Sequence, residues 1–370
     1  MTKASAKVRV LIVEDSAVAA TLLEHVLNAD PHLTVVGIAS SGEQALTLLP
    51  KLRPDVVLMD VRLPGIDGVE TTRRIMRIQP TPIVVTSAAL NDFSVTISMD
   101  ALRAGALSVI EKPLAVGRPE YAKLAKRLCT QIKIMSQVHV IRQRHQPLAM
   151  PARPALPVTG ALAASRSDGS RGQELSAATD GYRILGLVAS TGGPNALARI
   201  LGVLPGDFPL PVVLVQHIGA EFAEGFAAWL DTQTALSVAL ATHGEQLKPG
   251  RVHVAPGYRH LKLKGPLLML DDGPLVSGQR PSGTVLFQSM ADDFGPQAIG
   301  ALLTGMGDDG AQGLLAMRVR GAYTIAESEA TAVVYGMPAV AARLGAARIQ
   351  LPLDAIGACI LNAIKAQRDA

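Results

Sequence analysis

Acidic residues and one lysine stand directly after short apolar runs in the first half of the chain. Glu14 and Asp15 follow the first run, Asp60 follows the third and Lys112 follows the fifth. Any one of these residues alone could be an ordinary solvated loop residue. If the runs are parallel strands, however, their carboxyl ends meet at one sheet edge, where ligands bind. Clustered carboxylates suit Mg²⁺, so the pattern predicts a magnesium site where Lys112 pairs with Asp60 or with a phosphoryl group on it.

A second set of reactive side chains follows apolar runs in the other half. Ser190 comes directly after ILGLVA, His217 after PVVLVQ, and the pair Asp308 and Asp309 shortly after AIGALLTG. A serine at a strand-to-helix turn lies near backbone N–H groups that favour a developing oxyanion. A histidine at the next strand end could act as its general base, and one of the two aspartates could orient the imidazole. This arrangement predicts nucleophilic ester or amide chemistry.

Other interpretations of the turn at Ser190 stay open on the residues alone. The serine could be a helix N-cap. A dinucleotide-binding loop is disfavoured because GLVASTGG lacks the G-x-G-x-x-G order, and an α/β-hydrolase elbow because no G-x-S-x-G surrounds the serine. His243, His253 and His260 also lie in this half, and single histidines usually have structural roles. Of the four, only His217 directly follows a run that reads as a central strand.

Short β-branched runs alternate with longer amphipathic segments on both sides of a Pro-, Ala-, Ser- and Gly-rich stretch at 146–181, which predicts two α/β domains joined by a linker. In the first half the expected strands are Val8–Val13, Thr34–Ala39, Val56–Met59, Ile83–Val85 and Ser108–Ile110, and a helix is expected over Ala122–Val138. In the second half they are Ile184–Val188, Val212–Val215, Val252–Ala255, Ala298–Leu303 and Tyr323–Ala326, with a hairpin-like insert at 260–273. The first half is expected to be flavodoxin-like and the second a doubly wound, mostly parallel, Rossmann-like sheet.

Composition limits the classes of function. The net charge is +4 over 370 residues and the basic residues are scattered, so nucleic-acid binding is not expected. No apolar run approaches the roughly 18 residues that a membrane helix needs, and the N-terminal run is too short for a signal peptide. Cys129 and Cys359 lack metal-site spacing. A cytoplasmic protein without membrane insertion is therefore expected.

The pieces LIVEDS, PDVVLMDVRLPGIDG, VVTSA and SVIEKP closely resemble the receiver domain of two-component response regulators. The resemblance covers about Val8–Leu128, and it implies that Asp60 accepts a phosphoryl group in the presence of Mg²⁺. It further implies that the metal pocket consists of Glu14, Asp15, Asp60 and the backbone carbonyl of Arg62. It also implies that Ser87 and Lys112 are the switch residues and that the Lys112–Pro113 peptide bond is cis.

The pieces VASTGGP, VQHI, LLTGMGDDGAQG and AESEATAVVYGMP resemble the catalytic domain of the chemotaxis protein-glutamate methylesterases. This resemblance implies that Ser190 is the nucleophile, His217 the base and Asp309 the orienting acid. It also implies that Thr191 supports the histidine and that the Met306 backbone helps to bind the oxyanion. No cofactor is expected for the esterase chemistry.

One residue departs from the family pattern, since Asp308 stands where the family commonly has Asn. The expected domains are a receiver at 1–128, a helix end and linker at 129–180, and a catalytic domain at 181–370. The resemblance implies hydrolysis of glutamate γ-methyl esters and deamidation of glutamines on methyl-accepting chemoreceptors. It further implies a chemotaxis-type histidine kinase as phosphodonor.

Three rival functions were weighed against this interpretation. A binding-only regulator is disfavoured because all three triad groups are retained. A DNA-binding response regulator would need a helix-turn-helix or winged-helix output, and neither is evident. A generic lipase or esterase is disfavoured by the missing elbow and by the attached receiver.

Overall fold

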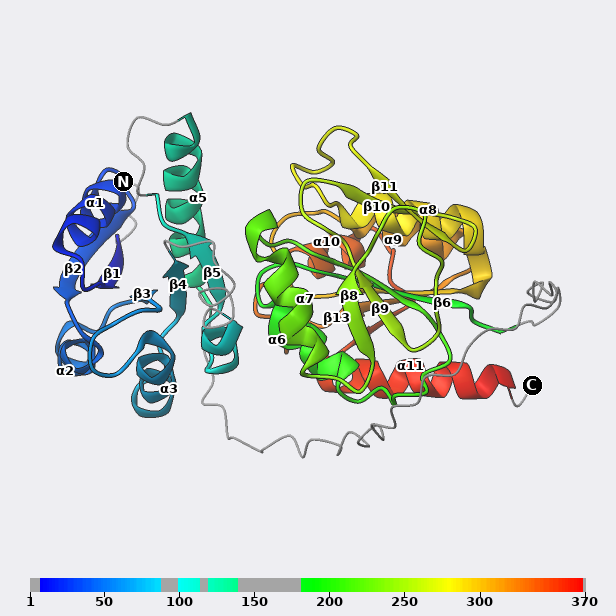
Figure 1. Cartoon of the computed structure of the whole chain (residues 1–370), viewed down its shortest axis with the longest axis horizontal. Helices are drawn as coiled ribbons and strands as arrows, with labels where there is room; N and C mark the ends of the chain where they lie inside the picture. The colour runs from blue at the N-terminus through cyan, green and yellow to red at the C-terminus, as the bar shows by residue number, and fades with distance from the viewer. Residues whose placement is uncertain (1–6, 88–98, 114–118, 139–180, 369–370) are drawn as a thin grey trace, which may run out of the picture.

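The chain folds into two α/β halves, shown in Figure 1. The computed structural model describes residues 7–87, 99–113, 119–138 and 181–368. The expected linker at 146–181 lies almost wholly outside the described residues. The expectation of an α/β protein with two parallel sheets is confirmed.

The first half is a five-stranded parallel sheet in the order β2-β1-β3-β4-β5, which is the flavodoxin-like order. Its strands are β1 (Val8–Val13), β2 (Leu33–Ala39), β3 (Val56–Asp60), β4 (Ile83–Ser87) and β5 (Ser108–Glu111). Its helices are α1 (Ala17–Asn28), α2 (Gly42–Leu52), α3 (Gly68–Ile78) and α5 (Pro119–Met135), and residues 99–103 are also helical. All five predicted strands are present, with ends that differ by two residues at most.

Side-chain caps explain where three of these helices begin. Ser16, Ser41 and Asp67 each accept a hydrogen bond from a backbone N–H in the first turn of α1, α2 and α3. Such a cap satisfies one of the N–H groups that a helix start leaves without a partner. The capped helix α1 begins two residues after Asp15, and α3 begins eight residues after Asp60.

The second half is a seven-stranded parallel sheet in the order β14-β13-β12-β6-β7-β9-β8. Its strands are β6 (Ile184–Ala189), β7 (Val212–Gln216), β8 (Ser237–Leu240), β9 (Arg251–Val254), β12 (Ala298–Leu302), β13 (Tyr323–Glu327) and β14 (Ile349–Leu351). The chain proceeds from β6 to β7 on one side, whereas β12 pairs with β6 on the other. This reversal of strand order creates a crevice at the carboxyl ends, where ligands bind in doubly wound sheets.

Helices cover both faces of this sheet. They are α6 (Gly193–Leu201), α7 (Ala223–Asp231), α8 (Gly283–Phe294), α9 (Ala311–Val319), α10 (Met337–Arg343) and α11 (Leu353–Arg368), with short 3₁₀ turns at Ala220–Phe222 and Gly295–Gln297. Side chains of β6 alternate between two cores: Leu185 and Leu187 pack on the side of α6 and α11, and Ile184 and Val188 on the side of α8 and α9. The predicted hairpin insert is confirmed as antiparallel β10 (His260–Lys264) and β11 (Leu267–Asp271).

Several details differ from the expectations. Strands β8 and β14 were not predicted, because they are four and three residues long and carry polar positions. The helix expected over Ala122–Val138 is α5, and it begins at Pro119. The peptide bond before Pro113 is not cis, since the cis bond found in the described residues is Arg280–Pro281. Among the described residues, none of the helices combines the length and apolarity needed to cross a bilayer.

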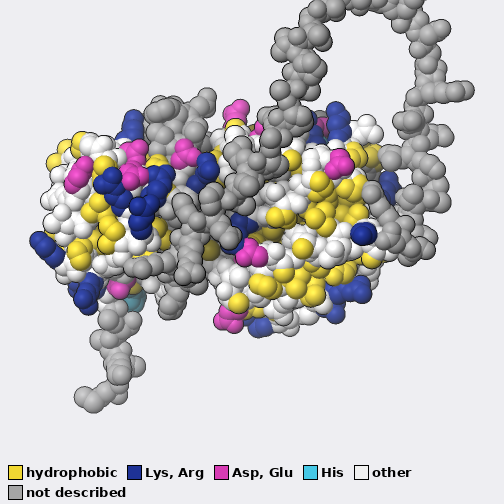
Figure 2. Space-filling model, turned by 90° about the horizontal axis from the view of Figure 1, so that it is seen from below, with side chains coloured by type: hydrophobic (Ala, Val, Ile, Leu, Met, Phe, Trp, Pro, Cys, Tyr) yellow, Lys and Arg dark blue, Asp and Glu magenta, His cyan; other side chains and the backbone are white. Residues whose placement is uncertain are grey.

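The surface seen from below mixes charges of both signs on the first half and gathers hydrophobic side chains on the second (Figure 2). Glu70, for example, forms ion pairs with both Arg73 and Arg74 on α3. On this face basic side chains of the first half lie beside acidic ones.

Candidate active site

The turn that carries Ser190 is held tightly at the end of β6. The Ser190 N–H donates to the carbonyl of Thr304 at 3.0 Å, and the Gly193 N–H donates to the carbonyl of Ser190 at 2.8 Å. Gly192 has a φ of +79°, and a Cβ there would lie 2.6 Å from the Cβ of Val333. Both the backbone conformation and the lack of space require glycine at this position. The serine is thus presented at the start of α6 by a rigid turn.

Gln216 links the serine turn to the neighbouring strand end. It is the last residue of β7 and is 4% exposed, and its side-chain amide donates to the carbonyls of Ser190 (2.8 Å) and His217 (3.0 Å). Its role was not predicted from the sequence. A buried polar residue that ends an otherwise apolar strand was the signal that could have found it.

Asp309 is a buried carboxylate surrounded by hydrogen-bond donors. It is 2% exposed. It accepts hydrogen bonds from His217 Nε2 (2.8 Å), the Ser282 hydroxyl (2.6 Å) and the backbone N–H groups of Gly283 (2.7 Å) and Thr284 (3.1 Å). The last two belong to the first turn of α8, whose dipole also favours an anion.

These contacts decide the ionisation state of Asp309. Burial on its own raises the pKa of the carboxyl group, but the hydrogen bonds from His217, Ser282 and Gly283 outweigh it and lower the pKa from 3.8 to about 2. Asp309 therefore stays negative throughout the physiological range and can stabilise an imidazolium.

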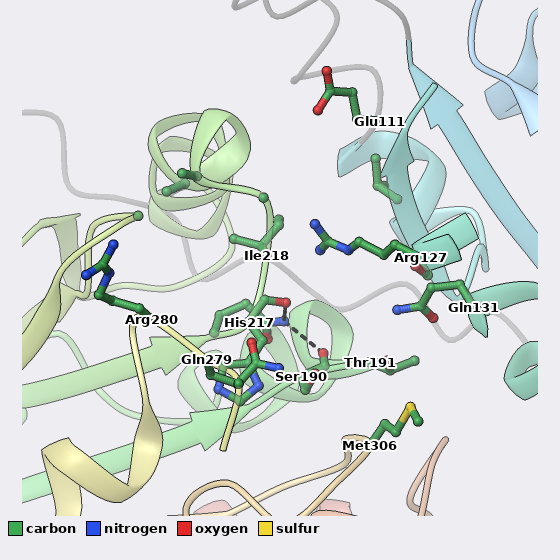
Figure 3. A pocket seen from close by; sticks show the side chains of 18 of the residues that line it. Glu111, Arg127, Gln131, Ser190, Thr191, His217, Ile218, Gln279, Arg280 and Met306 are labelled. Carbon is green, nitrogen blue, oxygen red and sulfur yellow. Dashed lines mark hydrogen bonds between the residues drawn. The ribbon is translucent and has the colours of Figure 1, made fainter. Parts of the chain in front are cut away.

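His217 uses one ring nitrogen for Asp309 and leaves the other available. The carboxylate accepts from Nε2, so the proton is on Nε2, and the buried Nδ1 has no partner among the described residues. Nδ1 is then the basic atom. In Figure 3 the ring lies beside Ser190, although no hydrogen bond joins the two side chains in the part of the chain that the structure describes. Catalytic hydrogen bonds often tighten only when substrate is bound.

The other predicted residues also line this site. Thr191 is 8% exposed, and its carbonyl accepts a hydrogen bond from Thr304 Oγ1; the described hydrogen bonds include none from its hydroxyl to His217. Met306 has an exposed side chain. A Cβ on Gly305 would lie 2.6 Å from the Cβ of Ser190, so the backbone that leads into Met306 runs against the serine. Asp308 is exposed at the same edge and does not contact the imidazole as Asp309 does.

A cleft of about 1520 Å³ surrounds these groups and is lined by both halves of the chain. The second half contributes Ser190, Thr191, His217, Met306 and Asp309. The first half contributes residues of β5 and α5, and Figure 3 shows Arg127 and Gln131 facing Ser190 across the cleft. The site is therefore covered by the first half in this structure.

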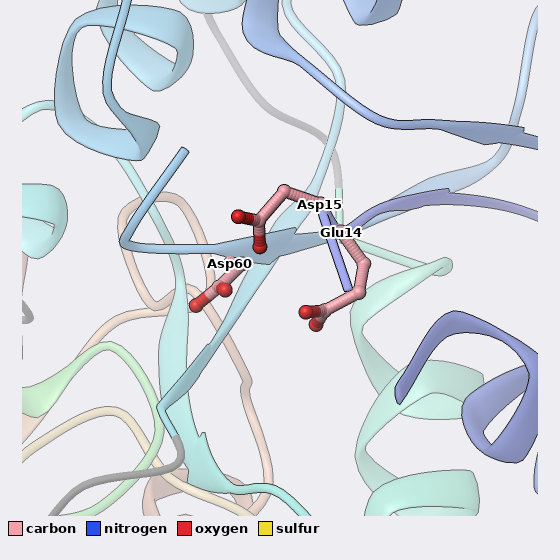
Figure 4. A group of neighbouring side chains, drawn as sticks. All are labelled: Glu14, Asp15 and Asp60. Carbon is pink, nitrogen blue, oxygen red and sulfur yellow. The ribbon is translucent and has the colours of Figure 1, made fainter. Parts of the chain in front are cut away.

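The acidic residues of the first half lie together at the ends of β1 and β3 (Figure 4). Oxygen atoms of Glu14, Asp15 and Asp60 lie within 4.8 Å of one another. The Lys112 ammonium forms ion pairs with Glu14 (2.6 Å) and Asp60 (2.8 Å). Ser87, the last residue of β4, is buried, and its carbonyl accepts a hydrogen bond from the Lys112 backbone at 3.1 Å. Four of the predicted residues thus meet at one sheet edge.

This carboxylate cluster fits a hard divalent cation. Burial, which outweighs the effect of Lys112, raises the pKa of Glu14, and the negative charge of Asp60 raises it further. A cation among the three carboxylates would relieve this repulsion, and oxygen donors of this kind suit Mg²⁺. Arg62 follows Asp60 by two residues, at the start of the segment between β3 and α3, and its side chain is exposed.

The fold and the two sites define a class of protein: a flavodoxin-like receiver with an acidic strand-end pocket, joined to a doubly wound domain with a serine, histidine and aspartate at its crevice. Two family descriptions match the chain: response regulator receiver domain over residues 10–119 and CheB methylesterase over residues 185–360.

Curated relatives match nearly the whole chain. Protein-glutamate methylesterase/protein-glutamine glutaminase 2 of Paramagnetospirillum magneticum is 48% identical over 355 residues, which are 95% of this chain and 96% of the relative. Protein-glutamate methylesterase/protein-glutamine glutaminase 3 of Anaeromyxobacter dehalogenans is 45% identical over 352 residues, which are 94% of this chain and 97% of the relative. The crystal structure of the Thermotoga maritima CheB methylesterase catalytic domain is 36% identical, with a TM-score of 0.48, and covers 49% of this chain and 98% of that one. The chain belongs to the protein-glutamate methylesterase/protein-glutamine glutaminase (CheB) family.

The low pKa of Asp309 predicts a pH-dependent contribution to stability. Because the pKa is lower in the folded protein (about 2) than its ordinary value of 3.8, the contribution is fully present above about pH 4 and is lost as pH falls toward 2. Between about pH 5 and pH 2, wild type should lose roughly 2 kcal/mol more of its free energy of unfolding than Asp309→Asn. Urea unfolding followed by fluorescence of Trp229, the one tryptophan, reports on this half.

The control variant is Asp308→Asn, because the neighbouring carboxylate is exposed and should leave the pH dependence of wild type unchanged. Parallel pH profiles for wild type and Asp309→Asn would contradict the assigned ionisation of Asp309.

Proposed function

We propose that the chain hydrolyses the γ-methyl esters of glutamates on methyl-accepting chemoreceptors, and deamidates receptor glutamines, through Ser190, His217 and Asp309. The observation that carries the proposal is the buried His217–Asp309 pair, which leaves Nδ1 free beside the serine turn. Membership of the family supports the choice of reaction. The expected cytoplasmic location remains a prediction.

The proposed chemistry follows from the positions of these groups. His217 Nδ1 takes the Ser190 proton as Oγ attacks the γ-carbonyl, and Asp309 stabilises the imidazolium that forms. Backbone N–H groups at the start of α6 and at Met306 stabilise the oxyanion. The imidazolium returns its proton to the methoxide, which leaves as methanol, or, for glutamine, to the amide nitrogen, which leaves as ammonia. Water, deprotonated by His217, then hydrolyses the acyl-enzyme.

The rim of the cleft supports a protein as substrate. Tyr258, Leu275 and Met306 line the cleft and are 70%, 59% and 47% exposed. They come from three separate loops, and large apolar side chains gathered around one opening are typical of a surface that contacts another macromolecule. A small free ester would leave these side chains in water.

Phosphorylation of Asp60 is the proposed input. Glu14, Asp15 and Asp60, with the carbonyl of Arg62, would hold Mg²⁺, which when bound would neutralise charge on the phosphoryl group. Lys112 already contacts Asp60 and would instead contact the phosphoryl oxygens, and the Ser87 hydroxyl would move toward them. A chemotaxis-type histidine kinase is the proposed phosphodonor.

The receiver is proposed to inhibit the catalytic domain by covering its cleft. The contact between the halves includes a hydrogen bond from Asn195 Nδ2 to the carbonyl of Leu102 at 2.9 Å and the packing of Val333 and Val334 against apolar residues of the receiver. Burial and, after it, the charge of Glu221 raise the pKa of Glu111. Tethering makes a weak contact sufficient, because the effective concentration of the receiver is high. A shift of ~3 kcal/mol would change the open population roughly a hundredfold.

Replacing Ser190 should abolish turnover without unfolding the protein. Ser190→Ala removes only the hydroxyl, so methanol release from a methylated receptor fragment should fall by about 10⁴-fold or more. Ser237→Ala, at an exposed serine of the same half, should keep wild-type turnover. A folded Ser190→Ala protein that still releases methanol at the wild-type rate would disprove the nucleophile.

Asp60 should be the site of phosphorylation. With Mg²⁺ and a small phosphodonor, intact mass should show one phosphoryl adduct on wild type and none on Asp60→Asn. Asp55→Asn, at an exposed aspartate of the same half, should be labelled like wild type. An adduct that persists in Asp60→Asn would refute the assignment.

Removing the receiver should make activity independent of phosphorylation. A fragment of residues 181–370 should release methanol without a phosphodonor, while the full chain should need one for high turnover, because only the full chain has a covered cleft. A folded fragment with no activity would instead mean that the receiver contributes to substrate binding or catalysis.

A further inference from the structure

We propose that His260 and Ser282 are positioning residues of the catalytic acid, and that they extend the triad into a chain of hydrogen bonds from His260 through Ser282 and Asp309 to His217. The inference rests on the proposed function, since it assigns these residues to the same reaction. The resemblances on which that function rests give no role to either residue.

Ser282 is placed to orient the carboxylate of Asp309. It is 0% exposed, and its hydroxyl donates to Asp309 Oδ1 at 2.6 Å, while Oδ2 accepts from His217. The same hydroxyl accepts the Val285 N–H at 3.4 Å as the N-cap of α8. Since a hydroxyl has one proton, accepting from Val285 leaves that proton for Asp309. Together with the N–H groups of Gly283 and Thr284, the Ser282 hydroxyl therefore fixes the orientation in which the carboxylate meets the imidazole.

His260 holds the backbone of Ser282 in place. It is 2% exposed, and both ring nitrogens have partners: Nδ1 accepts the Ser282 N–H at 3.2 Å, and Nε2 faces the carbonyl of Pro274 at 2.9 Å. A backbone N–H can only donate and a carbonyl can only accept. The ring is therefore neutral with its proton on Nε2, and it ties the Ser282 N–H to the carbonyl of Pro274.

This tie matters because the segment before Ser282 is a loop that borders the cleft. Residues 272–282 connect β11 to α8, and in Figure 3 Gln279 lies beside Ser190 and His217. Arg280 donates to the carbonyls of Asp272 and Gly273, which closes the loop at its base. Without His260, Ser282 would keep its contacts to α8 and Asp309 but lose the fixed attachment to β10. Small displacements of a catalytic group are costly, up to about 100-fold for 1 Å.

His253, in the same half, is a buried histidine whose surroundings can be compared with those of His260. It is 0% exposed, yet neither of its ring nitrogens has a hydrogen-bond partner among the described residues; Glu245 Oε1 lies 3.6 Å from its Nδ1. It does not contact a triad residue. His260 differs because each of its nitrogens is used and one leads directly to Asp309.

Two substitutions of His260 separate its two hydrogen bonds. In His260→Asn the amide oxygen replaces Nδ1 and can still accept from Ser282, whereas in His260→Gln the amide nitrogen reaches the position of Nε2 and can still donate to Pro274. Positioning through Ser282 predicts that His260→Gln lowers kcat by about tenfold to a hundredfold with KM within about twofold. His260→Asn should keep kcat within about threefold.

The experiment measures kcat and KM for methanol release from a methylated receptor fragment, together with the downfield NMR signal of the His217 Nε2 proton, in the full-length protein. The NMR signal should shift or broaden in His260→Gln and stay in place in His260→Asn. Ser282→Ala should also lower kcat and shift the signal of the His217 Nε2 proton. If His260→Gln does not fold, Ser282→Ala alone tests the positioning role. His243→Gln is the matched control, because the exposed His243 Nδ1 also accepts a backbone N–H, from Leu270, which is not a hydrogen-bond partner of Asp309.

The possible outcomes separate this inference from the proposed function. If His260→Gln and Ser282→Ala fold and keep both wild-type kcat and the wild-type signal, the positioning role is refuted. Equal losses in His260→Asn and His260→Gln would also refute it, because they would show a role in packing alone. If wild type releases no methanol but the NMR signal responds as expected, the proposed substrate is wrong and the positioning role stands.

Discussion

The burial of the Asp309 carboxylate as an anion is the constraint on which the catalytic half depends. An unpaired charge at this depth would be prohibitively costly, so the fold must bring donors to it. They come from the end of β7 through His217 and from the start of α8. The start of α8 can come this close because residue 283 is glycine: a Cβ there would lie 2.3 Å from Val188 Cγ1. Helix, strand end and catalytic acid are therefore positioned by one set of contacts.

The residues of this site that could be predicted from the sequence are those that stand at the end of a strand or shortly after it. Ser190, His217 and Asp309 stand at or just beyond buried apolar runs, and parallel strands bring their carboxyl ends together whatever the loops do. The same reasoning predicted the cluster of Glu14, Asp15 and Asp60. Pattern and topology were sufficient because each of these residues stands at or shortly after the carboxyl end of a parallel strand.

The residues that sequence reasoning missed are positioned by contacts between distant segments. His260 and Ser282 are 22 residues apart and meet only because the loop after β11 folds back on β10. No periodicity describes that loop. His260 was noted as one of several histidines, but its separation from Asp309 in the chain gave no reason to prefer it. Strands β8 and β14 were missed for a related reason, since their position at the sheet edges rather than their apolarity defines them.

The two acidic sites show that the surroundings of a carboxylate decide whether its charge is fixed or can respond to a ligand. Asp309 has four donors and a pKa of about 2, so its charge is permanent and suits a part that must not change during the reaction. Burial and the negative charge of Asp60 raise the pKa of Glu14, and one lysine, Lys112, forms an ion pair with it. Its charge is only partly compensated, so a cation or a phosphoryl group can change the local balance. The carboxylate of Asp309 is thus saturated with donors, whereas that of Glu14 is not.

The path from the receiver site to the cleft is short in this structure. Lys112 contacts Asp60, and the residue before it, Glu111, lines the cleft opposite Glu221. Glu111 and Lys112 both line the cleft, and Lys112 also contacts Asp60, so the end of β5 borders both sites. In the proposed regulation, a phosphoryl group that draws Lys112 inward acts on the peptide unit that also holds Glu111 against a like charge. The negative charge of Glu221, which raises the pKa of Glu111, opposes closure in that proposal, so a displacement of this end of β5 would favour release of the cover.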